Sequence, residues 1–189
     1  MPKMKKESRV IGIDDSPFNK FTKKNVLIIG TVFRGGFCLD GIVATKARVD
    51  GSNATKKIVE MINKCKFKPQ LRAILLNGIA VGGFNIVDIR ELYKKTKIPV
   101  IVVVRRKPDI ENIKQTLMRI NKKSKISLLD KAGPVEKFGT IYAQYKGLKR
   151  DQVQEVLTIT STRSFIPEPI RVAHLIGAGI VMGESKGGA

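Results

Sequence analysis

The sequence is poor in the residues that form disulfides and structural metal sites. Its 189 residues include two cysteines, Cys38 and Cys65, and a single histidine, His174. Neither cysteine has a CxxC partner and one histidine cannot complete a Cys/His cluster, so a structural zinc site is excluded. The spacing of the two cysteines does not by itself exclude a disulfide between them. Two cysteines in a chain without a secretion signal nevertheless favour two ordinary buried thiols in a reducing compartment.

Long apolar runs are also missing. The longest, around Pro99–Val104 and Leu175–Met182, are far shorter than the roughly 20 residues that a membrane-spanning helix needs. The charged start, Met1 to Lys6, has no apolar segment behind it and does not resemble a signal peptide. The sequence therefore predicts a soluble, cytoplasmic protein with no membrane contact.

Acidic residues are scarce, with 16 Asp and Glu against 36 Lys and Arg, which gives a net charge of +20. Such an excess predicts a polyanionic partner, nucleic acid before an anionic membrane. A basic proteome produces the same bias without any function, and this alternative stays open. The hydrophobic content of 42% and the even composition predict one domain over residues 1–189.

The order of periodic segments predicts an α/β fold. Apolar β-type segments are expected at residues 10–14, 26–33, 37–49, 72–76, 98–104 and 138–145. Helices are expected from Ser52 or Asn53 to Cys65, and over residues 86–97, 108–123, 151–161 and 169–182. Hairpins join the first three strands, whereas helical crossovers join the next two. The prediction is a mixed five-stranded sheet, three antiparallel strands and then two parallel ones, flanked by helices.

Two adjacent carboxylates, Asp14 and Asp15, end the first strand. Carboxylates at the end of a buried strand cost desolvation and repulsion unless a cation offsets them. That cation is a metal ion or a Lys or Arg side chain, and the sequence does not decide between them. Strand alternation puts the two acids on opposite faces, so both cannot point into one site.

Further acids follow at the ends of other elements. Asp50 is either a second ligand beside Asp14, as Mg²⁺ commonly takes one or two carboxylates, or a turn former with Gly51. The glycine-rich segment from Asn77 to Gly83 is neither a P-loop nor a dinucleotide fingerprint. Asp88 is a further ligand or a solvated residue.

The last predicted helix carries Glu168, Arg171 and His174 at i+3 steps, so they share one arc. Glu168 either favours the positive helix end or is catalytic. A lone histidine at the edge of an apolar helix is hydrogen-bonded structure or a catalyst.

Separated motifs, in order, resemble the archaeal family related to endonuclease V and known as endonuclease dU, in the ribonuclease-H-like superfamily. They are Ile11 to Asp15, Val49 to Gly51 with Ala54-Thr55, Gly82 to Asp88, Ile98 to Val100, and Pro167 to Leu175. The resemblance covers nearly the whole chain. It implies Mg²⁺- or Mn²⁺-dependent phosphodiester hydrolysis in nucleic acid, DNA before RNA, near deaminated bases such as uracil or hypoxanthine, as in DNA repair.

The resulting hypothesis assigns three groups of residues. The catalytic group is Asp14, Asp50, Glu168 and His174; the metal ligands are Asp14, Asp50, Asn77 and Asp88; the nucleic-acid contacts are Arg105, Arg106, Lys107 and Arg171. Hydrolysis requires that Asp14, Asp50 and Glu168 converge on one ion.

Asn77-Gly78 departs from the family's pattern, because endonuclease V has Asp-Gly there. An amide offers a metal its carbonyl oxygen but no negative charge. The alternative is therefore a catalytically inactive nucleic-acid-binding protein of the same fold, and a third interpretation is an RNA- or ribosome-associated factor.

Overall fold

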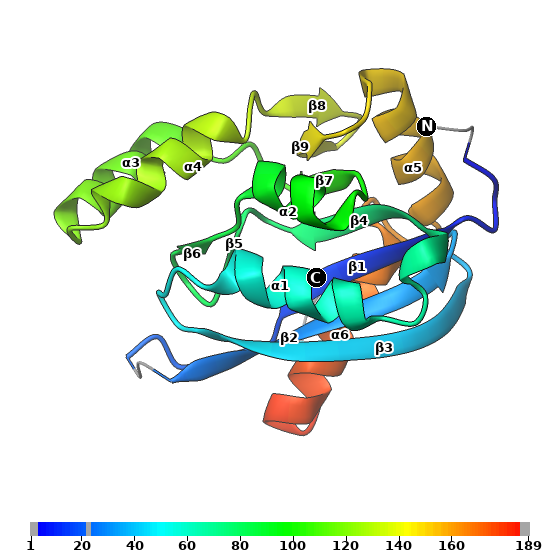
Figure 1. Cartoon of the computed structure of the whole chain (residues 1–189), viewed down its shortest axis with the longest axis horizontal. Coiled ribbons are helices and arrows are strands. Elements are labelled where there is room, and N and C mark those ends of the chain that lie inside the picture. Colours follow the sequence, from blue (N-terminus) through cyan, green and yellow to red (C-terminus); the bar gives the residue numbers. More distant parts are fainter. Residues whose placement is uncertain (1–3, 22–23, 186–189) are drawn as a thin grey trace.

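A seven-stranded sheet with helices on both faces forms the body of the protein (Figure 1). The computed structural model describes residues 4–21 and 24–185. Its strands are β1 (Arg9–Asp15), β2 (Asn25–Arg34), β3 (Cys38–Arg48), β4 (Leu71–Asn77), β5 (Ala80–Val81), β6 (Asn85–Ile86), β7 (Val100–Val104), β8 (Glu136–Phe138) and β9 (Ile141–Lys146). The α-helices are α1 (Ala54–Lys64), α2 (Ile89–Thr96), α3 (Ile110–Arg119), α4 (Ile126–Lys131), α5 (Arg150–Thr160) and α6 (Glu168–Met182). Short 3-10 turns occur at η1 (Lys68–Gln70) and η2 (Lys123–Lys125).

The sheet order is β3-β2-β1-β4-β7-β9-β8. β1, β2 and β3 pair antiparallel, and β1, β4 and β7 are mutually parallel. These pairings confirm the predicted mixed sheet, but the sheet has two more strands than expected. The segment predicted as one strand at 138–145 is a hairpin, β8 and β9, which extends the sheet beyond β7.

The topology brings four strand ends to one edge of the sheet. β1, β4 and β7 run in the same direction, and β3 shares it because it is two antiparallel steps from β1. The carboxyl ends of all four strands therefore lie at the same edge, which is called the carboxyl edge below. Reactive groups of open α/β sheets usually gather at such an edge.

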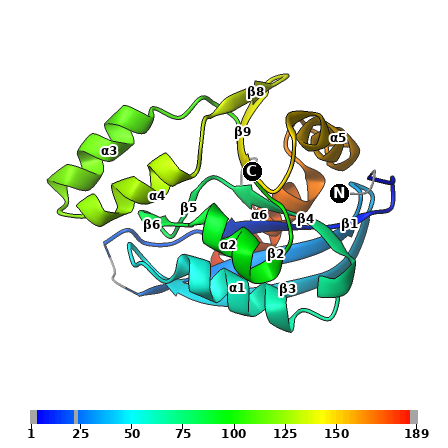
Figure 2. The same ribbon diagram turned by 45° about the horizontal axis from the view of Figure 1, so that its top comes forward.

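Alternation along β1 divides the core into two layers. Ile11 and Ile13 pack under α1 and α2, whereas Val10 packs under α5 and α6. Figure 2 shows the two helical layers on either side of the sheet, with α3 and α4 reaching out beyond it. A small separate cluster around Leu117 and Leu129 holds α3 and α4 together.

Gly12 allows α6 to approach the sheet closely. A Cβ at this position would lie 2.3 Å from the carbonyl carbon of Pro169, so no other residue fits without a shift. The Thr31 hydroxyl, on β2, donates to the Pro169 carbonyl oxygen at 2.6 Å. The first turn of α6 is thereby fixed against β1 and β2, which determines where the rest of the helix lies.

Two helix boundaries differ from the prediction. The helix expected from residue 86 begins at Ile89, because Asp88 caps it. The helix expected over 108–123 ends at Arg119, and the chain then turns into η2 and α4. Cys38 and Cys65 are both free thiols, but only Cys65 is buried as ordinary buried thiols would be; Cys38 is exposed at the start of β3, so that expectation is wrong for it. Among the helices of residues 4–21 and 24–185, none is long and apolar enough to cross a membrane.

Candidate active site at the carboxyl edge

Asp14 is a buried carboxylate without a lysine or arginine partner in the described ranges. It is 4% exposed at the end of β1. Its Oδ2 lies 2.9 Å from Nδ1 of His174, and its Oδ1 accepts the Asp15 backbone N–H at 3.0 Å. Burial, and then the charge of Asp15, raise the pKa of Asp14 to about 6, while hydrogen bonds from Asn77 and His174 partly oppose the rise. The neighbours of Asp14 therefore stabilise its negative charge less than burial and Asp15 destabilise it.

Three elements bring the neighbours of Asp14 together. Asn77 ends β4, and because Ile13 pairs with Leu76 in parallel register, Asn77 comes next beside Asp14. Its hydrogen bond to the carboxylate uses the amide N–H, so the amide oxygen takes no part in that bond. His174 comes from the second turn of α6 and is 25% exposed at its side chain. Asp14, Asn77 and His174 are called the Asp14 site below.

Asp15 points away from this site, as strand alternation predicts. Its Oδ2 accepts the backbone N–H of Gly82 at 2.9 Å, and the Gly82 carbonyl accepts the N–H of Asp50 at 2.8 Å. Desolvation raises the pKa of Asp15. Asp15 thus fixes the loop between β4 and β6, a role for which the sequence gives no specific signal.

Asp50 shapes a turn at the same edge. Its backbone is left-handed, with φ at 55°, and its Oδ1 accepts the Phe84 N–H at 2.8 Å. Lys122 Nζ lies 3.9 Å from the same carboxylate oxygen and donates to the Asp50 carbonyl oxygen at 2.7 Å. These contacts support the turn-former interpretation of Asp50 rather than the metal-ligand one.

Lys125 is a structural residue that sequence reasoning missed. It is 5% exposed, and its Nζ donates to the carbonyl oxygens of Asp50 at 3.1 Å and Phe84 at 2.6 Å, and also to that of Gly51. Desolvation, and then the charge of Lys122, lower the pKa of its amino group. Nothing in the sequence distinguishes this lysine from its many exposed neighbours.

Asp88 and Glu168 have structural partners of their own. Asp88 Oδ1 accepts the backbone N–H groups of Arg90 and Glu91, each at 2.9 Å, and so caps α2. Glu168 is 5% exposed and forms a two-pronged ion pair with Arg171, whose Nε donates to Oε2 at 2.8 Å. The pairing also occupies the guanidinium of Arg171, which was expected to contact nucleic acid.

The predicted convergence of Asp14, Asp50 and Glu168 on one ion is wrong. Within the described ranges, no group of three or more His, Cys, Asp or Glu side chains could hold a metal. Asp50 is held by the Phe84 backbone N–H and by Lys122, and Glu168 is held by Arg171. The hydrolytic hypothesis therefore depends on the Asp14 site alone.

The Asp14 site fits one divalent ion rather than two. It offers one buried carboxylate, the amide oxygen of Asn77 and an imidazole, and Mg²⁺ is commonly held by only one or two carboxylates with water and phosphate filling the other positions. The incomplete compensation of Asp14 is the structural observation that fits a cation. Asp50 and Asp88 do not add to this donor set.

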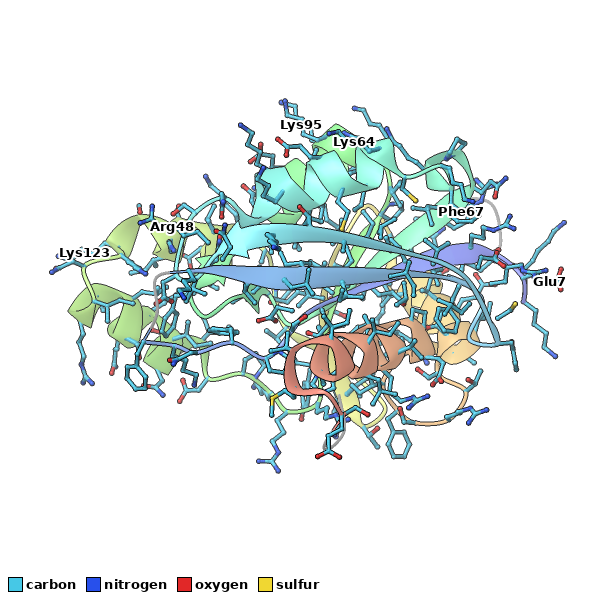
Figure 3. All side chains as sticks on the ribbon, turned by 90° about the horizontal axis from the view of Figure 1, so that it is seen from below. Glu7, Arg48, Lys64, Phe67, Lys95 and Lys123 are labelled. Carbon is cyan, nitrogen blue, oxygen red and sulfur yellow. The ribbon has the colours of Figure 1, made fainter. Side chains whose placement is uncertain are left out.

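Positive charge lies near this edge but is not confined to it. Three exposed cations follow β7, the strand beside β4: Arg105, Arg106 and Lys107. Figure 3 shows other cations at different places on the surface, with Arg48 and Lys123 toward one end and Lys64 and Lys95 over the α1 and α2 layer. Charge alone therefore does not mark one binding face.

Comparison with known proteins decides the family. The profile of the family described as endonuclease dU matches residues 6–181. The chain belongs to this family. A UPF0215 protein of Methanothermobacter thermautotrophicus is 46% identical over 98% of the chain and 94% of its own length. A UPF0215 protein of Methanosarcina mazei is 45% identical over 98% of the chain and 97% of its own length.

Solved structures confirm the fold of this endonuclease dU family member. A protein of unknown function from Archaeoglobus fulgidus has a TM-score of 0.85 at 36% identity, over 92% of this chain and 98% of that one. Endonuclease V of Bacillus subtilis has a TM-score of 0.61 at 10% identity, over 91% of this chain and 81% of that one. Endonuclease V of Ciona intestinalis, in complex with an inosine-containing DNA, has a TM-score of 0.56 at 15% identity, over 88% of this chain and 82% of that one. The endonuclease-V-like fold is thus confirmed.

Proposed function

We propose that the protein is a metal-dependent endonuclease that hydrolyses phosphodiester bonds in nucleic acid near deaminated bases. Uracil and hypoxanthine are the proposed lesions, DNA is preferred to RNA, and Mg²⁺ or Mn²⁺ is the proposed cofactor. The observation that carries the proposal is Asp14, a buried acid at the carboxyl edge whose pKa is raised to about 6. Family membership and the endonuclease-V-like fold support the same reaction class.

The residues of the Asp14 site have separate roles in this proposal. A bound divalent ion would lower the pKa of a water molecule and stabilise negative charge on the phosphate. Asp14, ionised at neutral pH, and the amide oxygen of Asn77 would hold it. His174 presents Nδ1 to Asp14, which fixes the tautomer and leaves Nε2 to accept or release a proton.

The cations after β7 position the substrate. Arg105, Arg106 and Lys107 are exposed beside the carboxyl end of β4, where a phosphate backbone bound at Asn77 passes. Their contacts are independent of sequence and weaken with salt.

A second function, nucleic-acid binding without cleavage, is favoured by one observation. Among the described residues no group of three or more His, Cys, Asp or Glu side chains could hold a metal, and at the Asp14 site Asn77 supplies an amide in place of a second carboxylate. A lone carboxylate binds Mg²⁺ more weakly than a pair. Such a protein would bind oligonucleotides in a salt-sensitive way and leave them intact.

One cleavage assay separates the two functions. Metal-stripped protein is incubated with end-labelled oligonucleotides that contain uracil, hypoxanthine or only normal bases, with Mg²⁺, Mn²⁺ or EDTA. The endonuclease proposal expects metal-dependent nicking of lesion strands, lost in Asp14→Asn and reduced in His174→Gln. The matched control is Asp88→Asn, which changes an acid that only caps α2 and keeps its hydrogen-bonding oxygen.

The outcomes are distinct. Nicking that persists in Asp14→Asn contradicts the proposed site. Tight, salt-sensitive binding with no nicking at any metal concentration supports the second function instead.

A further inference from the structure

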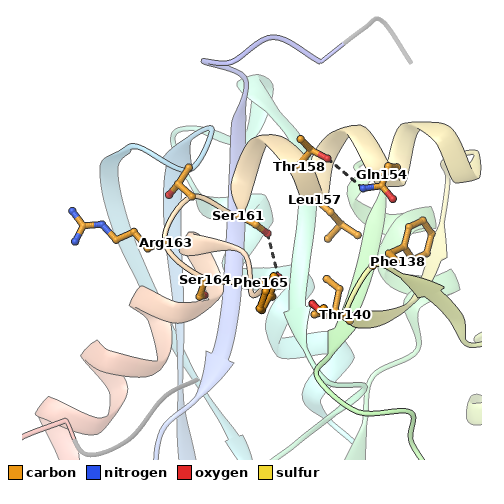
Figure 4. A pocket seen from close by; sticks show the side chains of 12 residues that line it. Phe138, Thr140, Gln154, Leu157, Thr158, Ser161, Arg163, Ser164 and Phe165 are labelled. Atoms are coloured by element: carbon orange, nitrogen blue, oxygen red, sulfur yellow. Dashed lines mark hydrogen bonds between the residues drawn. The ribbon is translucent and has the colours of Figure 1, made fainter.

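A pocket of about 520 Å³ lies on the α5 and α6 side of the sheet, and none of its lining residues belongs to the Asp14 site. Figure 4 shows it between α5, the loop that leads into α6, and the β8–β9 hairpin. Phe138, Ile141, Leu157 and Phe165 form its apolar walls, and serine and threonine side chains lie between them. Arg163 is the charged residue of the lining, which contains no acidic side chain.

The loop at the pocket mouth is held in place by its own hydroxyl groups. Ser161 Oγ donates to the Phe165 carbonyl oxygen at 3.3 Å (Figure 4), and Thr162 Oγ1 donates to the Gly36 carbonyl oxygen at 2.9 Å. These two bonds anchor the backbone of the loop. A preorganised loop binds a ligand with little loss of conformational entropy.

Phe165 and Arg163 are both largely exposed, and their exposure does not contribute to the stability of the fold. Phe165 is 70% exposed, although burying a phenylalanine stabilises a protein by about 1.5–3 kcal/mol. The Arg163 side chain is 79% exposed. Its Nε lies 4.0 Å from the carboxylate of Glu168, which is already paired with Arg171. In Figure 4 the ring of Phe165 lies in the pocket and the guanidinium of Arg163 extends outward from its rim.

The pocket and the Asp14 site lie on the same face of the sheet. The loop that carries Arg163 and Phe165 is anchored toward the edge of the sheet opposite that site, where Thr162 bonds to Gly36 just beyond the end of β2.

The β9 wall of the pocket lies nearer to Asn77. Asn77, Val103 and Ala143 are successive partners across β4, β7 and β9. At about 4.8 Å between neighbouring strands, Ala143 lies roughly 10 Å from Asn77. Ile141, in the pocket wall, is two residues before Ala143 on β9. Single-strand sites commonly cover about 4–16 nucleotides, so one strand can reach both places.

We infer that this pocket is a nucleotide subsite: it holds one unpaired base of a bound strand against Phe165, while Arg163 binds the adjoining phosphate. The inference rests on the proposed function for its choice of ligand. Aromatic side chains with basic groups beside them are the usual means of binding single strands without sequence preference. The apolar walls suit a planar ring, and the absence of acids in the lining suits an anionic neighbour. An apolar side chain of a protein partner would use Phe165 but would not require Arg163.

Binding without cleavage tests the subsite independently of nuclease activity. Fluorescence anisotropy in EDTA measures the Kd of a labelled single-stranded 12-mer for wild type, Phe165→Ala, Phe165→Tyr, Phe165→Leu and Arg163→Ala. The controls are Ile42→Ala, an exposed apolar residue of β3 at the far side of the sheet, and Arg72→Ala, an exposed arginine of β4. Each variant is also measured on a strand of the same length made only of abasic sugar phosphates.

Stacking predicts a pattern that altered folding does not reproduce. Phe165→Ala and Phe165→Leu should weaken binding about 5-fold or more, Phe165→Tyr should restore it, and the loss should vanish on the abasic strand. Arg163→Ala should weaken binding to both strands and reduce the slope of log K against log salt by about 0.7. Both controls should bind as wild type does.

Two results overturn the inference. In the first, wild type binds the 12-mer and the Phe165 and Arg163 variants bind it with the same Kd. This result would refute the subsite without contradicting the proposed nuclease activity. In the second, the Phe165→Ala loss is the same on the abasic strand, which assigns the pocket to a partner other than a base. Failure of the proposed function is recognised separately, as absence of metal-dependent nicking.

Discussion

Replacing Asp14 by asparagine should stabilise the protein at neutral pH while abolishing metal-dependent activity. Asp14 is buried, and desolvation first and the Asp15 charge second raise its pKa from 3.8 to about 6. The folded state therefore holds a proton more tightly than the unfolded chain does. Stability linked to this group is greatest below pH 4, falls as the pH rises toward 6, and stays low above it.

The magnitude follows from the pKa change. At 1.36 kcal/mol for each pKa unit, the rise to about 6 costs the ionised folded state about 3 kcal/mol at pH 7.5. Asparagine has nearly the same shape and carries no charge, so Asp14→Asn should recover up to that amount at pH 7.5 and little at pH 4. In a chain of 189 residues, each kcal/mol shifts Tm by about 2–4 °C.

Thermal and urea unfolding at pH 4 and pH 7.5, in EDTA and with Mn²⁺, measure the effect. The matched control is Asp40→Asn: burial opposes ionisation of Asp40, but hydrogen bonds from Arg9 and Arg34 outweigh it and lower its pKa, so the control should destabilise the protein. Mn²⁺ should raise the Tm of wild type and not that of Asp14→Asn. A loss of stability in Asp14→Asn at pH 7.5 would show that the carboxylate is fully compensated, and the reasoning would fail.

Three further substitutions test other contacts. Gly12→Ala puts a Cβ against the Pro169 backbone; it should cost about 1–3 kcal/mol in urea unfolding and displace α6, so nicking should fall as well. Lys125→Met leaves three carbonyl oxygens without their donor and should cost about 1–3 kcal/mol, whereas Met in place of exposed Lys123 should change stability little. Asn77→Asp adds a second carboxylate to the site: calorimetry should show tighter Mn²⁺ binding, Tm in EDTA should fall, and unchanged Mn²⁺ affinity would exclude Asn77 from the site.

The sequence was most informative where one local rule decided the outcome. Alternation along β1 correctly separated Asp14 from Asp15, since side chains of a regular strand must point to opposite faces. Crossover helices correctly made the strands at residues 72–76 and 98–104 parallel, which puts Asn77 beside Asp14 at the carboxyl edge.

The two misassigned acids differ in what the sequence could show. Asp50 lies beside Lys122, 72 residues along the chain, and no periodicity reports such a pair. Glu168 pairs with Arg171 one i+3 step along α6, a contact that helical spacing does indicate. Even with 36 basic residues available, only three-dimensional packing shows which carboxylates lie beside a cation and which do not.

The cap formed by Asp88 is a different case, because an acid just before a helix is a recognisable N-cap signal. This signal predicts a start of α2 at Ile89 rather than at Ile86.

The contact between β1 and α6 supports the role proposed for Asp14. Gly12, Asp14 and Ser16 occupy alternate positions facing α6; Gly12 is the residue that this close contact requires, whereas Asp14 and Ser16 place polar groups in it at a cost in stability. Gly12 contributes no side chain, Asp14 is a buried charge, and Ser16 Oγ, buried against Gly177, has no hydrogen-bond partner within the part of the chain described. An apolar sequence at these positions would widen the core, but it would push α6 away and separate His174 from Asp14. Because the unfavourable residues are concentrated along the one contact that brings histidine and carboxylate together, the geometry of that pair is the property that this interface preserves at the expense of stability.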